Sequence, residues 1–324
     1  MFDFPEGKRY NTSAGRYHRI YGERLQKLVI DAGFTCPNRD GTVGSGGCSY
    51  CDNAAFHPGY STPGKSLLQQ IDEGIWFHRR RYPKVNHYLA YFQSYSNTYG
   101  PVEHLRRVYS EALAHPQVVG IVIGTRPDCI DDTKLDLLEE LREMPMPGRP
   151  EPFRTPLIQV EYGIESCYDA TLEHVGRGHG FDCARRAVET TAARGFDVGA
   201  HFILGLPGET RQMLLDQCTT INALPLNSVK FHQLQLVRGT RMEAEAREHP
   251  ERFLEWTLDE YLDLIVDILE RLRPDLHIER VAGEVPPRFV GKARWGLIRN
   301  FQILHLLDAR LEARDTRQGV LAAR

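Results

Sequence analysis

The sequence predicts an α/β fold: an incomplete (β/α)6 TIM-like barrel of parallel strands with a C-terminal capping extension. Three observations lead to this prediction. Short runs rich in β-branched and aromatic residues alternate with longer amphipathic segments, which is typical of a parallel sheet with right-handed crossover helices. Six such strands with helices on one side favour a barrel over a flat, doubly wound sheet. Polar residues also follow the strands, where the site of either arrangement lies.

The predicted elements follow one another along most of the chain. The strands are expected at residues 27–32, 88–93, 118–124, 157–162, 197–204 and 228–236. The helices between them are expected at residues 67–82, 102–115, 132–143, 181–194 and 210–223.

The pattern changes near residue 250. A helix is expected at 258–272, an extended piece at 277–281 and a last helix at 295–313. We therefore expect two parts: a core barrel with its N-terminal lead-in at residues 1–250, and an extension at residues 251–324. Because no linker-like stretch separates them, the extension should pack on the barrel.

The composition favours an ordinary soluble globular protein, with 41% apolar and 26% charged residues. No stretch approaches the roughly 18 continuous apolar residues of a membrane helix, and residues 1–10 lack the apolar core of a secretory signal. We expect a cytoplasmic protein that does not enter a membrane. The net charge of −3 is not that of a dedicated nucleic-acid binder. We interpret the basic segments at residues 8–27 and 78–81 as solvated helix faces rather than as an RNA-binding patch.

The seven cysteines are odd in number in a long chain, which argues against a disulfide framework and favours metal or redox chemistry. Three of them, Cys36, Cys48 and Cys51, fall within sixteen residues. The other four stand alone and are expected to be small buried core residues: Cys129, Cys167, Cys183 and Cys218. A second metal cluster built from Cys129 and Cys167 is a weaker hypothesis.

The clustered cysteines lie after the first predicted strand, in a segment that has five glycines and a proline in and beside it. Thiolates are soft ligands that suit zinc or iron–sulfur clusters. Three ligands leave one metal position open for a substrate or cofactor, whereas a structural zinc site takes four. His57 could supply the fourth ligand of a Cys3His zinc site. The following barrel disfavours zinc, because zinc ribbons are small hairpin units, but both interpretations remain open at this point.

The segment from Cys36 to Cys51 resembles the cluster-binding loop of the radical S-adenosylmethionine (SAM) superfamily, with a longer first spacing. Other segments are similar to the branch that contains the elongator catalytic subunit and the oxygen-independent coproporphyrinogen oxidase: residues 125–128, 162–166, 177–179 and 201–209. A narrower combination looks like the bacterial YhcC/YtqA-type radical SAM proteins: residues 36–41, 92–99 and 230–234. The resemblance covers roughly residues 8–299.

The resemblance implies a 4Fe-4S cluster held by Cys36, Cys48 and Cys51, with the fourth iron binding SAM. It also implies a set of SAM contacts: Tyr50 near the adenine, Tyr95 and Ser96 at the amino group, Glu165 at the ribose, Arg177 at the carboxylate, and Thr125 and His201. Four of these positions depart from the family pattern. A glycine pair is usual at Tyr95 and Ser96, His201 stands where relatives often carry an acidic residue, and Thr125 lies at or beside a position where they often carry glutamate. Glu165 could instead cap a helix, and Arg177 could pair with a surface carboxylate.

The resemblance implies a reaction but no substrate. The reduced cluster would cleave SAM to a 5′-deoxyadenosyl radical that abstracts a substrate hydrogen, with electrons from a one-electron reductant such as flavodoxin or ferredoxin. RNA, in particular tRNA, and a small molecule or protein side chain are competing substrate classes. The alternative from another class is a zinc-stabilised Cys3His binding protein without catalysis.

Overall fold

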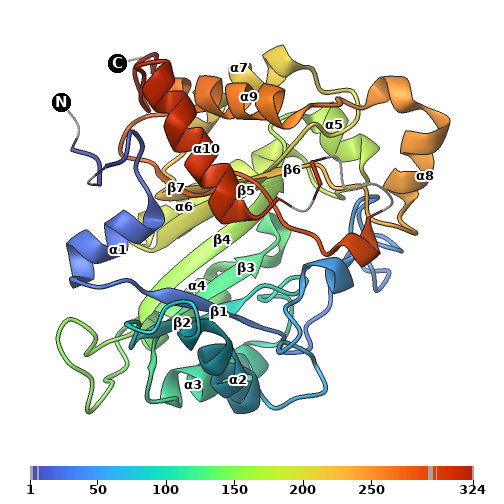
Figure 1. Ribbon diagram of the computed structural model, residues 1–324. Coiled ribbons are helices and arrows are strands. Elements are labelled where there is room, and N and C mark those ends of the chain that lie inside the picture. Colours follow the sequence, from blue (N-terminus) through green and yellow to red (C-terminus); the bar gives the residue numbers. More distant parts are fainter. Residues whose placement is uncertain (1–2, 6, 291–294, 297, 323–324) are drawn as a thin grey trace.

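The computed structural model describes residues 3–5, 7–290, 295–296 and 298–322. Its centre is a seven-stranded parallel sheet in which every strand pairs with its neighbour in the chain, in the order β1 to β7. The sheet curves into an open half-barrel (Figure 1). The strands are β1 (Gln26–Ile30), β2 (Tyr88–Phe92), β3 (Val118–Thr125), β4 (Leu157–Glu165), β5 (Asp197–Leu204), β6 (Ser228–Gln233) and β7 (His277–Arg280). The predicted fold class is confirmed.

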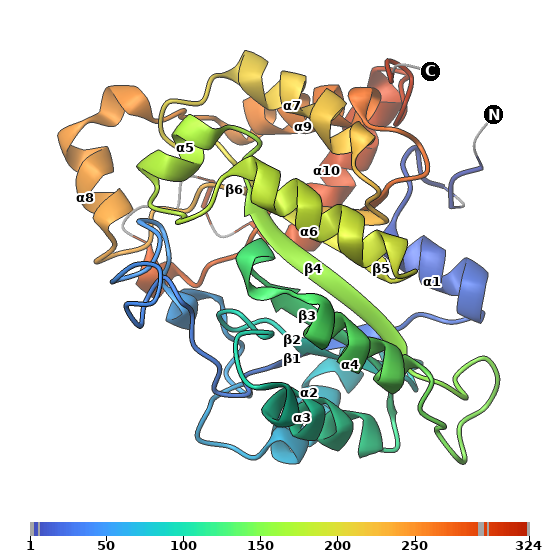
Figure 2. The same cartoon turned by 180° about the vertical axis from the view of Figure 1, so that it is seen from behind.

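Most crossover helices cover the outer face of the sheet, and Figure 2 shows α3, α4 and α6 in front of the strands. The helices are α1 (Ser13–Tyr21), α2 (Leu67–Arg79), α3 (Val102–Ala114), α4 (Asp132–Arg142), α5 (Asp169–His174), α6 (Phe181–Ala193), α7 (Arg211–Ala223), α8 (Arg241–Glu248), α9 (Leu258–Arg271) and α10 (Asn300–Ala313). Side-chain caps define several starts: Asp131 accepts from the backbone of Lys134, and Thr257 and Glu260 form a capping box.

The main hydrophobic core lies between the sheet and these helices. Strands β2 and β3 are buried along their whole length, as expected for strands covered on both faces. The two neighbouring strands contribute alternate residues, such as Val160 and Tyr162 of β4, to the same core. No helix in the described part of the chain is long and apolar enough to cross a membrane.

The structure adds elements that the sequence did not predict. The extended piece expected at 277–281 joins the sheet as β7, where Ile278 pairs with Val229 of β6. Residues 251–324 therefore supply a strand of the sheet, while the expected division of the chain at residue 250 stays a prediction. Helices α1, α5 and α8 are short, with nine, six and eight residues, and were not predicted. Helix α10 begins at Asn300, later than expected.

The N-terminal lead-in closes the amino end of the half-barrel. The Tyr17 hydroxyl of α1 donates to Oε1 of Gln159 on β4 at 3.2 Å, and Arg16 pairs with Asp197 of β5 at 2.7 Å. Segments near the two chain ends pair with each other, since the backbone of Gln318 donates to Arg9.

The concave face of the sheet carries a network of ion pairs. Lys27 Nζ of β1 lies 2.5 Å from Oε1 of Glu161 on β4 and 2.6 Å from Oε2 of Glu279 on β7. Lys230 Nζ of β6 lies 2.6 Å from Glu161, 3.0 Å from Glu279 and 3.0 Å from the Tyr91 hydroxyl. Because β1 and β7 are the two edge strands, Lys27 and Glu279 connect the open sides of the half-barrel.

Candidate functional site

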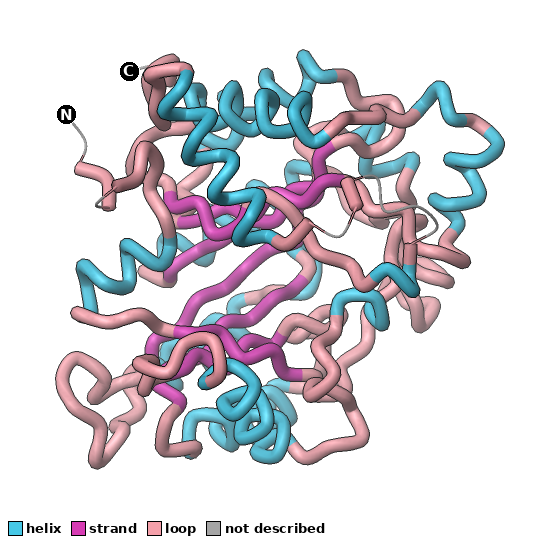
Figure 3. Tube along the Cα trace, in the orientation of Figure 1, coloured by secondary structure: helices cyan, strands magenta, loops and turns pink. Residues whose placement is uncertain are grey.

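The loops that follow the strands gather at the carboxyl edge of the sheet, on the right-hand side of Figure 3. The cysteine segment lies there, and backbone hydrogen bonds hold it in place. Ser49 donates to Val175 and accepts from Met242 of α8, both at 2.9 Å. Ser96, after β2, donates to Thr35, the residue before Cys36, at 3.2 Å. The segment is therefore tied to β2, to the α5–α6 loop and to α8.

Two of the three clustered cysteines, Cys48 and Cys51, occupy one turn with cationic neighbours. The Cys51 amide donates to the Cys48 carbonyl at 3.0 Å, which turns the pair toward one side. Arg177 Nη1 lies 3.5 Å from the Cys48 sulfur, and Asn38 Nδ2 lies 3.4 Å from it. Arg39 Nη2 donates to the Cys51 carbonyl at 2.7 Å.

The pKa values of the Cys48 and Cys51 thiols shift in opposite directions. Burial would raise the pKa of the Cys48 thiol, but the positive charges of Arg177 and Arg126 outweigh it, and the pKa lies below its ordinary value. Burial raises the pKa of the Cys51 thiol, with Cys48 adding to the effect and Arg39 opposing it. A thiolate is the ligand form of cysteine, so the guanidinium groups favour metal ligation at Cys48.

Arg177 and Glu165 meet over a glycine of β4. Arg177 is buried, its Nη2 atom donates to the Gly163 carbonyl, and the same atom lies 3.7 Å from Oε1 of Glu165. A Cβ atom on Gly163 would lie 2.5 Å from Glu165 Oε1 and 2.9 Å from Arg177 Nη2. The absence of a side chain at Gly163 therefore makes room for both charged groups.

Backbone strain occurs at two of the predicted site residues. Among the described non-glycine residues, only Tyr95, Glu165 and Asp315 have positive φ angles; those of Tyr95 and Glu165 are 61° and 73°. This conformation is costly for residues with a Cβ, and such strain gathers at functional sites. Tyr95 is exposed, and its ring lies 5.5 Å from the Arg39 guanidinium.

The remaining predicted contacts lie at neighbouring strand ends. Tyr50 packs against a small apolar cluster that contains Leu206, and its buried hydroxyl has no hydrogen-bond partner among the described residues. The Ser96 hydroxyl is likewise buried without a partner there. Thr125 is buried and hydrogen-bonds Thr98 at 2.7 Å. Sequence reasoning had placed these residues at one edge of the sheet, and the structure does so too.

His201 of β5 lies on the concave face, one residue before Phe202, the ladder partner of Glu165. It pairs with Gly163 in the β4–β5 ladder, and its Nε2 atom lies 2.8 Å from Oε2 of Glu161. Its role as a SAM contact stays a prediction. Glu161 was not singled out from the sequence, although a charged residue in an otherwise apolar strand is the signal that could have found it.

His57 has partners of its own. Its Nε2 atom lies 2.8 Å from the Ser94 hydroxyl, and its Nδ1 atom lies 3.5 Å from Oδ2 of Asp31. In the part of the chain that the structure describes, no three His, Cys, Asp or Glu side chains are arranged to hold a single metal ion. This holds for Cys36, Cys48 and Cys51 alone as well as for the three cysteines together with His57.

The solitary cysteines differ in their surroundings. Cys129 and Cys218 are buried, as expected, whereas Cys167 is half-buried and packs against the main core. Cys183 on α6 is only half-buried and is not part of a core cluster, so that expectation is wrong for this residue. An amphipathic helix has flanks as well as a core face, which explains this position.

The residues present suit a cluster with SAM. Three cysteines supply soft donors beside a guanidinium, and buried polar atoms are left without partners: the Tyr50 hydroxyl, the Ser96 hydroxyl and Arg177 Nε. Buried polar groups are normally paired, so these atoms indicate a polar ligand. Arg126 also has an unpaired buried nitrogen; its other nitrogens form a two-point pair with Asp128. Sequence reasoning assigned no role to Arg126.

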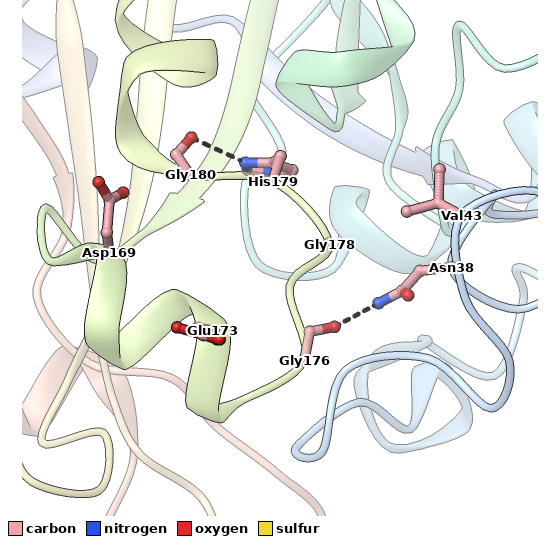
Figure 4. Close-up of a pocket in the computed structure, with 8 residues that line it drawn as sticks. All are labelled: Asn38, Val43, Asp169, Glu173, Gly176, Gly178, His179 and Gly180. Atoms are coloured by element: carbon pink, nitrogen blue, oxygen red, sulfur yellow. Dashed lines mark hydrogen bonds between the residues drawn. The ribbon is translucent and has the colours of Figure 1, made fainter.

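A cavity of about 510 Å³ lies beside the cysteine segment (Figure 4). Asn38 and Val43 line it on one side and residues 169–180 on the other. The Asn38 side chain donates to the Gly176 carbonyl at 2.7 Å, which holds the two walls together. None of the predicted site residues lines this cavity.

Comparison with known proteins gives a consistent result. A model of the radical SAM superfamily matches residues 36–218, and one of the radical SAM C-terminal domain matches residues 226–313. Uncharacterized protein YtqA of Bacillus subtilis (strain 168) is 34% identical over 312 residues, which are 96% of this chain and 92% of the relative. Protein YhcC of Escherichia coli (strain K12) is 35% identical over 235 residues, 72% of this chain and 71% of the relative.

A solved structure shares the fold. The archaeal Methanocaldococcus infernus Elp3 with an N-terminal deletion has a TM-score of 0.63 at 15% sequence identity. The match covers 91% of this chain and 64% of the Elp3 chain, so this chain spans less than two thirds of that protein.

Proposed function

Because the chain belongs to the radical SAM superfamily, we propose that it is an enzyme in which Cys36, Cys48 and Cys51 hold three irons of a 4Fe-4S cluster and the fourth iron binds SAM. The observation that supports this most is the position of Arg177, which contacts the Cys48 sulfur with one nitrogen and faces Glu165 with another. The chemistry of such a site is reductive cleavage of SAM to methionine and a 5′-deoxyadenosyl radical, which abstracts a hydrogen from the substrate.

The residues of the chain then act by binding and orientation. Arg177 binds the SAM carboxylate, since a guanidinium can bond a carboxylate at two points. Glu165 accepts hydrogen bonds from the ribose hydroxyls, and the unpaired Ser96 hydroxyl faces the amino group. Tyr50 packs at the adenine together with Leu206.

The closed amino end of the half-barrel contributes to the reaction. Tyr17 and the Lys27–Glu161–Lys230 network fill the concave face below the site. These side chains would limit the access of water to the site from the amino end of the half-barrel. We also propose a one-electron reductant such as flavodoxin or ferredoxin as partner, because the cleavage consumes one electron.

We propose RNA, in particular tRNA, as the substrate class. The support is an exposed aromatic and basic surface at the end of α2, beside the starts of β1 and β2 and so at the opposite edge of the sheet from the cysteine segment. The side chains of Trp76 and Phe77 are exposed, at 60% and 53%, and Arg80 lies 4.1 Å from the Trp76 ring. Arg24 and Arg81 both lie over the Tyr82 ring, at 4.0 and 5.5 Å.

This surface suits an anionic partner with stackable bases. Within the described ranges, no ion pair with a carboxylate is formed by Arg24, Arg80 or Arg81, whose guanidinium groups lie over aromatic rings. Phosphates would supply the missing negative charge, and exposed aromatic rings stack on unpaired bases. A small molecule or a protein side chain is the alternative, which the net charge of −3 favours.

Retention of tRNA at low and high salt tests the substrate class. We expect the Arg80→Gln/Arg81→Gln double variant to bind tRNA more weakly and to lose about 0.7 to 0.9 of the logarithmic salt slope per phosphate contact removed. The matched control is Arg185→Gln/Arg186→Gln, which removes two adjacent arginines that Asp182 already pairs. Equal effects of the two variants, or no salt-sensitive retention, would rule out this RNA surface.

The cluster itself is tested by colour and metal content. Protein purified without oxygen should be brown, absorb near-ultraviolet and visible light, and contain about four irons. Colourless protein with one zinc per chain would instead support the zinc-stabilised binding protein.

A further inference from the structure

The concave-face network ends on a side chain at the floor of the candidate site. His201 joins the network through a single contact, from its Nε2 atom to Oε2 of Glu161. The Glu161 side chain is 1% exposed and the His201 side chain is 20% exposed. The network is thus buried on the glutamate side and partly exposed to solvent on the histidine side.

We propose that Glu161 is a positioning residue that holds His201 with its Nδ1 atom free to accept a hydrogen bond from a ligand in the site. The ligand group is a hydroxyl or amine donor rather than a carboxylate or phosphate oxygen. The inference rests on the proposed function only for the identity of the ligand, SAM. The orientation and proton position of His201 follow from the protein alone.

The charge state of Glu161 is the first step. Burial would raise the pKa of this carboxyl group, but the charges of Lys230 and Lys27 and the bond from His201 outweigh it and hold the pKa well below its ordinary value. An ionised carboxylate only accepts hydrogen bonds. His201 Nε2 must therefore carry the hydrogen that bonds Glu161.

The charges of the network balance without a contribution from His201. Two ammonium groups, Lys27 and Lys230, already face two carboxylates, Glu161 and Glu279. A neutral imidazole with hydrogen on Nε2 has its lone pair on Nδ1. Within the residues that the structure describes, nothing else hydrogen-bonds His201.

The ring of a second histidine, His232 of β6, lies beside His201, with ring centroids 6.0 Å apart. Burial lowers the pKa of His232 well below its ordinary value, and the positive charges of Arg280 and Lys230 lower it further. His232 is therefore neutral and adds no charge that would turn the His201 ring.

The position of His201 relates this nitrogen to the proposed SAM contacts. His201 is the ladder partner of Gly163, and Glu165 and Arg177 lie directly over Gly163. Partners in adjacent strands are about 5 Å apart, so the His201 ring lies beside these two groups on one face. The floor therefore offers a hydrogen-bond acceptor next to an anion and a cation.

The first test is the proton position of His201. Nitrogen–proton correlation spectra of the full-length protein labelled on histidine show which ring nitrogen carries hydrogen, and His201→Phe identifies the signal. We expect hydrogen on Nε2 in the wild type and a mixture of both forms in Glu161→Gln. Hydrogen mainly on Nδ1 in the wild type would overturn the proposal.

The second test is coupling in SAM affinity, measured by calorimetry on cluster-loaded protein. His201→Phe and Glu161→Gln should each weaken SAM binding by about tenfold, the effect of one charge-assisted hydrogen bond. Combined, they should weaken it little more than either alone, because both remove the same contact. Multiplied effects would contradict the proposal.

The control is Glu279→Gln, which removes the other carboxylate of the network without touching His201. It should leave the His201 proton on Nε2 and SAM affinity within about twofold of the wild type. If Glu279→Gln changes the His201 proton position and the SAM affinity as Glu161→Gln does, Glu161 acts only through the stability of the fold. The spectra need neither cluster nor SAM, so a failure of the proposed function and a failure of this inference give different results.

Discussion

Arg177 places its Nη1 atom 3.5 Å from the sulfur of Cys48, although the two residues are 129 positions apart in the chain. The contact joins the cysteine segment after β1 to the loop between α5 and α6. It also brings a guanidinium that is buried with an unpaired Nε atom to the edge of the proposed cluster. This relationship supports both the thiolate form of Cys48 and a binding site for a carboxylate.

Arg177→Lys should reduce SAM affinity. Lysine keeps the charge but cannot bond a carboxylate at two points, so one charge-assisted hydrogen bond of about 1.5 to 3 kcal/mol is lost. We expect the Kd for SAM to rise by about 10- to 100-fold, measured by calorimetry on iron-loaded protein. Arg185→Lys, at an exposed position on α6, is the control. An unchanged Kd would remove Arg177 from the SAM site.

Gly163→Ala should displace Glu165 and Arg177 without unfolding the protein. The new Cβ atom would lie 2.5 Å and 2.9 Å from their side chains, so one or both must move. We expect iron content to be kept and SAM affinity to fall at least tenfold. Gly64→Ala is the matched control, because a Cβ atom there meets nothing within 4 Å. Equal SAM affinity in both variants would show that these two side chains do not contact SAM.

The triple variant of Cys36, Cys48 and Cys51 to Ala should lose the cluster. All the iron ligands that the chain supplies are removed, so we expect colourless protein with less than about a tenth of the wild-type iron. Far-ultraviolet circular dichroism should show that the fold is kept. Cys183→Ala, on the half-buried flank of α6, should stay brown. A brown triple variant would place the cluster elsewhere.

Glu161→Gln should alter how stability depends on pH. The pKa of Glu161 is lowered in the folded protein, so this group stabilises the fold above its ordinary pKa of about 4.3 and the contribution is lost as the pH falls toward the folded-state value. Removing one partner of a buried ion pair costs about 3 to 5 kcal/mol. Thermal unfolding should show a large difference between wild type and variant at pH 7 that shrinks below about pH 4.

Glu189→Gln, which removes an exposed carboxylate on α6, should leave the melting temperature within about 2 °C of the wild type at both pH values. A difference between wild type and Glu161→Gln that is constant between pH 3 and pH 7 would show that Glu161 does not act through its charge.

The strands and main helices could be predicted because their patterns are local. Strands β2 and β3 are continuous apolar runs, and α9 repeats its apolar residues with helical spacing. Strand β7 has only four residues, two of them charged, so it was expected as an extended piece and not as a member of the sheet. Its place depends on pairing with β6, which is a tertiary property.

The candidate site was predicted in part for the same reason. Polar residues at strand ends could be placed at one edge of the sheet, and the structure brings Arg177, Glu165 and Cys48 together there. The ion-pair network could not be predicted, because no local pattern shows that Lys27 and Glu279 meet across the open side. Likewise, the role of Gly163 depends on what lies over it, which the sequence does not show.

Formation of 5′-deoxyadenosine tests the central claim most directly. Protein with a reconstituted cluster is mixed with SAM and dithionite without oxygen, and the products are separated by liquid chromatography and mass spectrometry. We expect 5′-deoxyadenosine and methionine in equal amounts, dependent on the reductant and absent from the triple cysteine variant. Intact SAM in the presence of a reduced, fully loaded cluster would contradict the account.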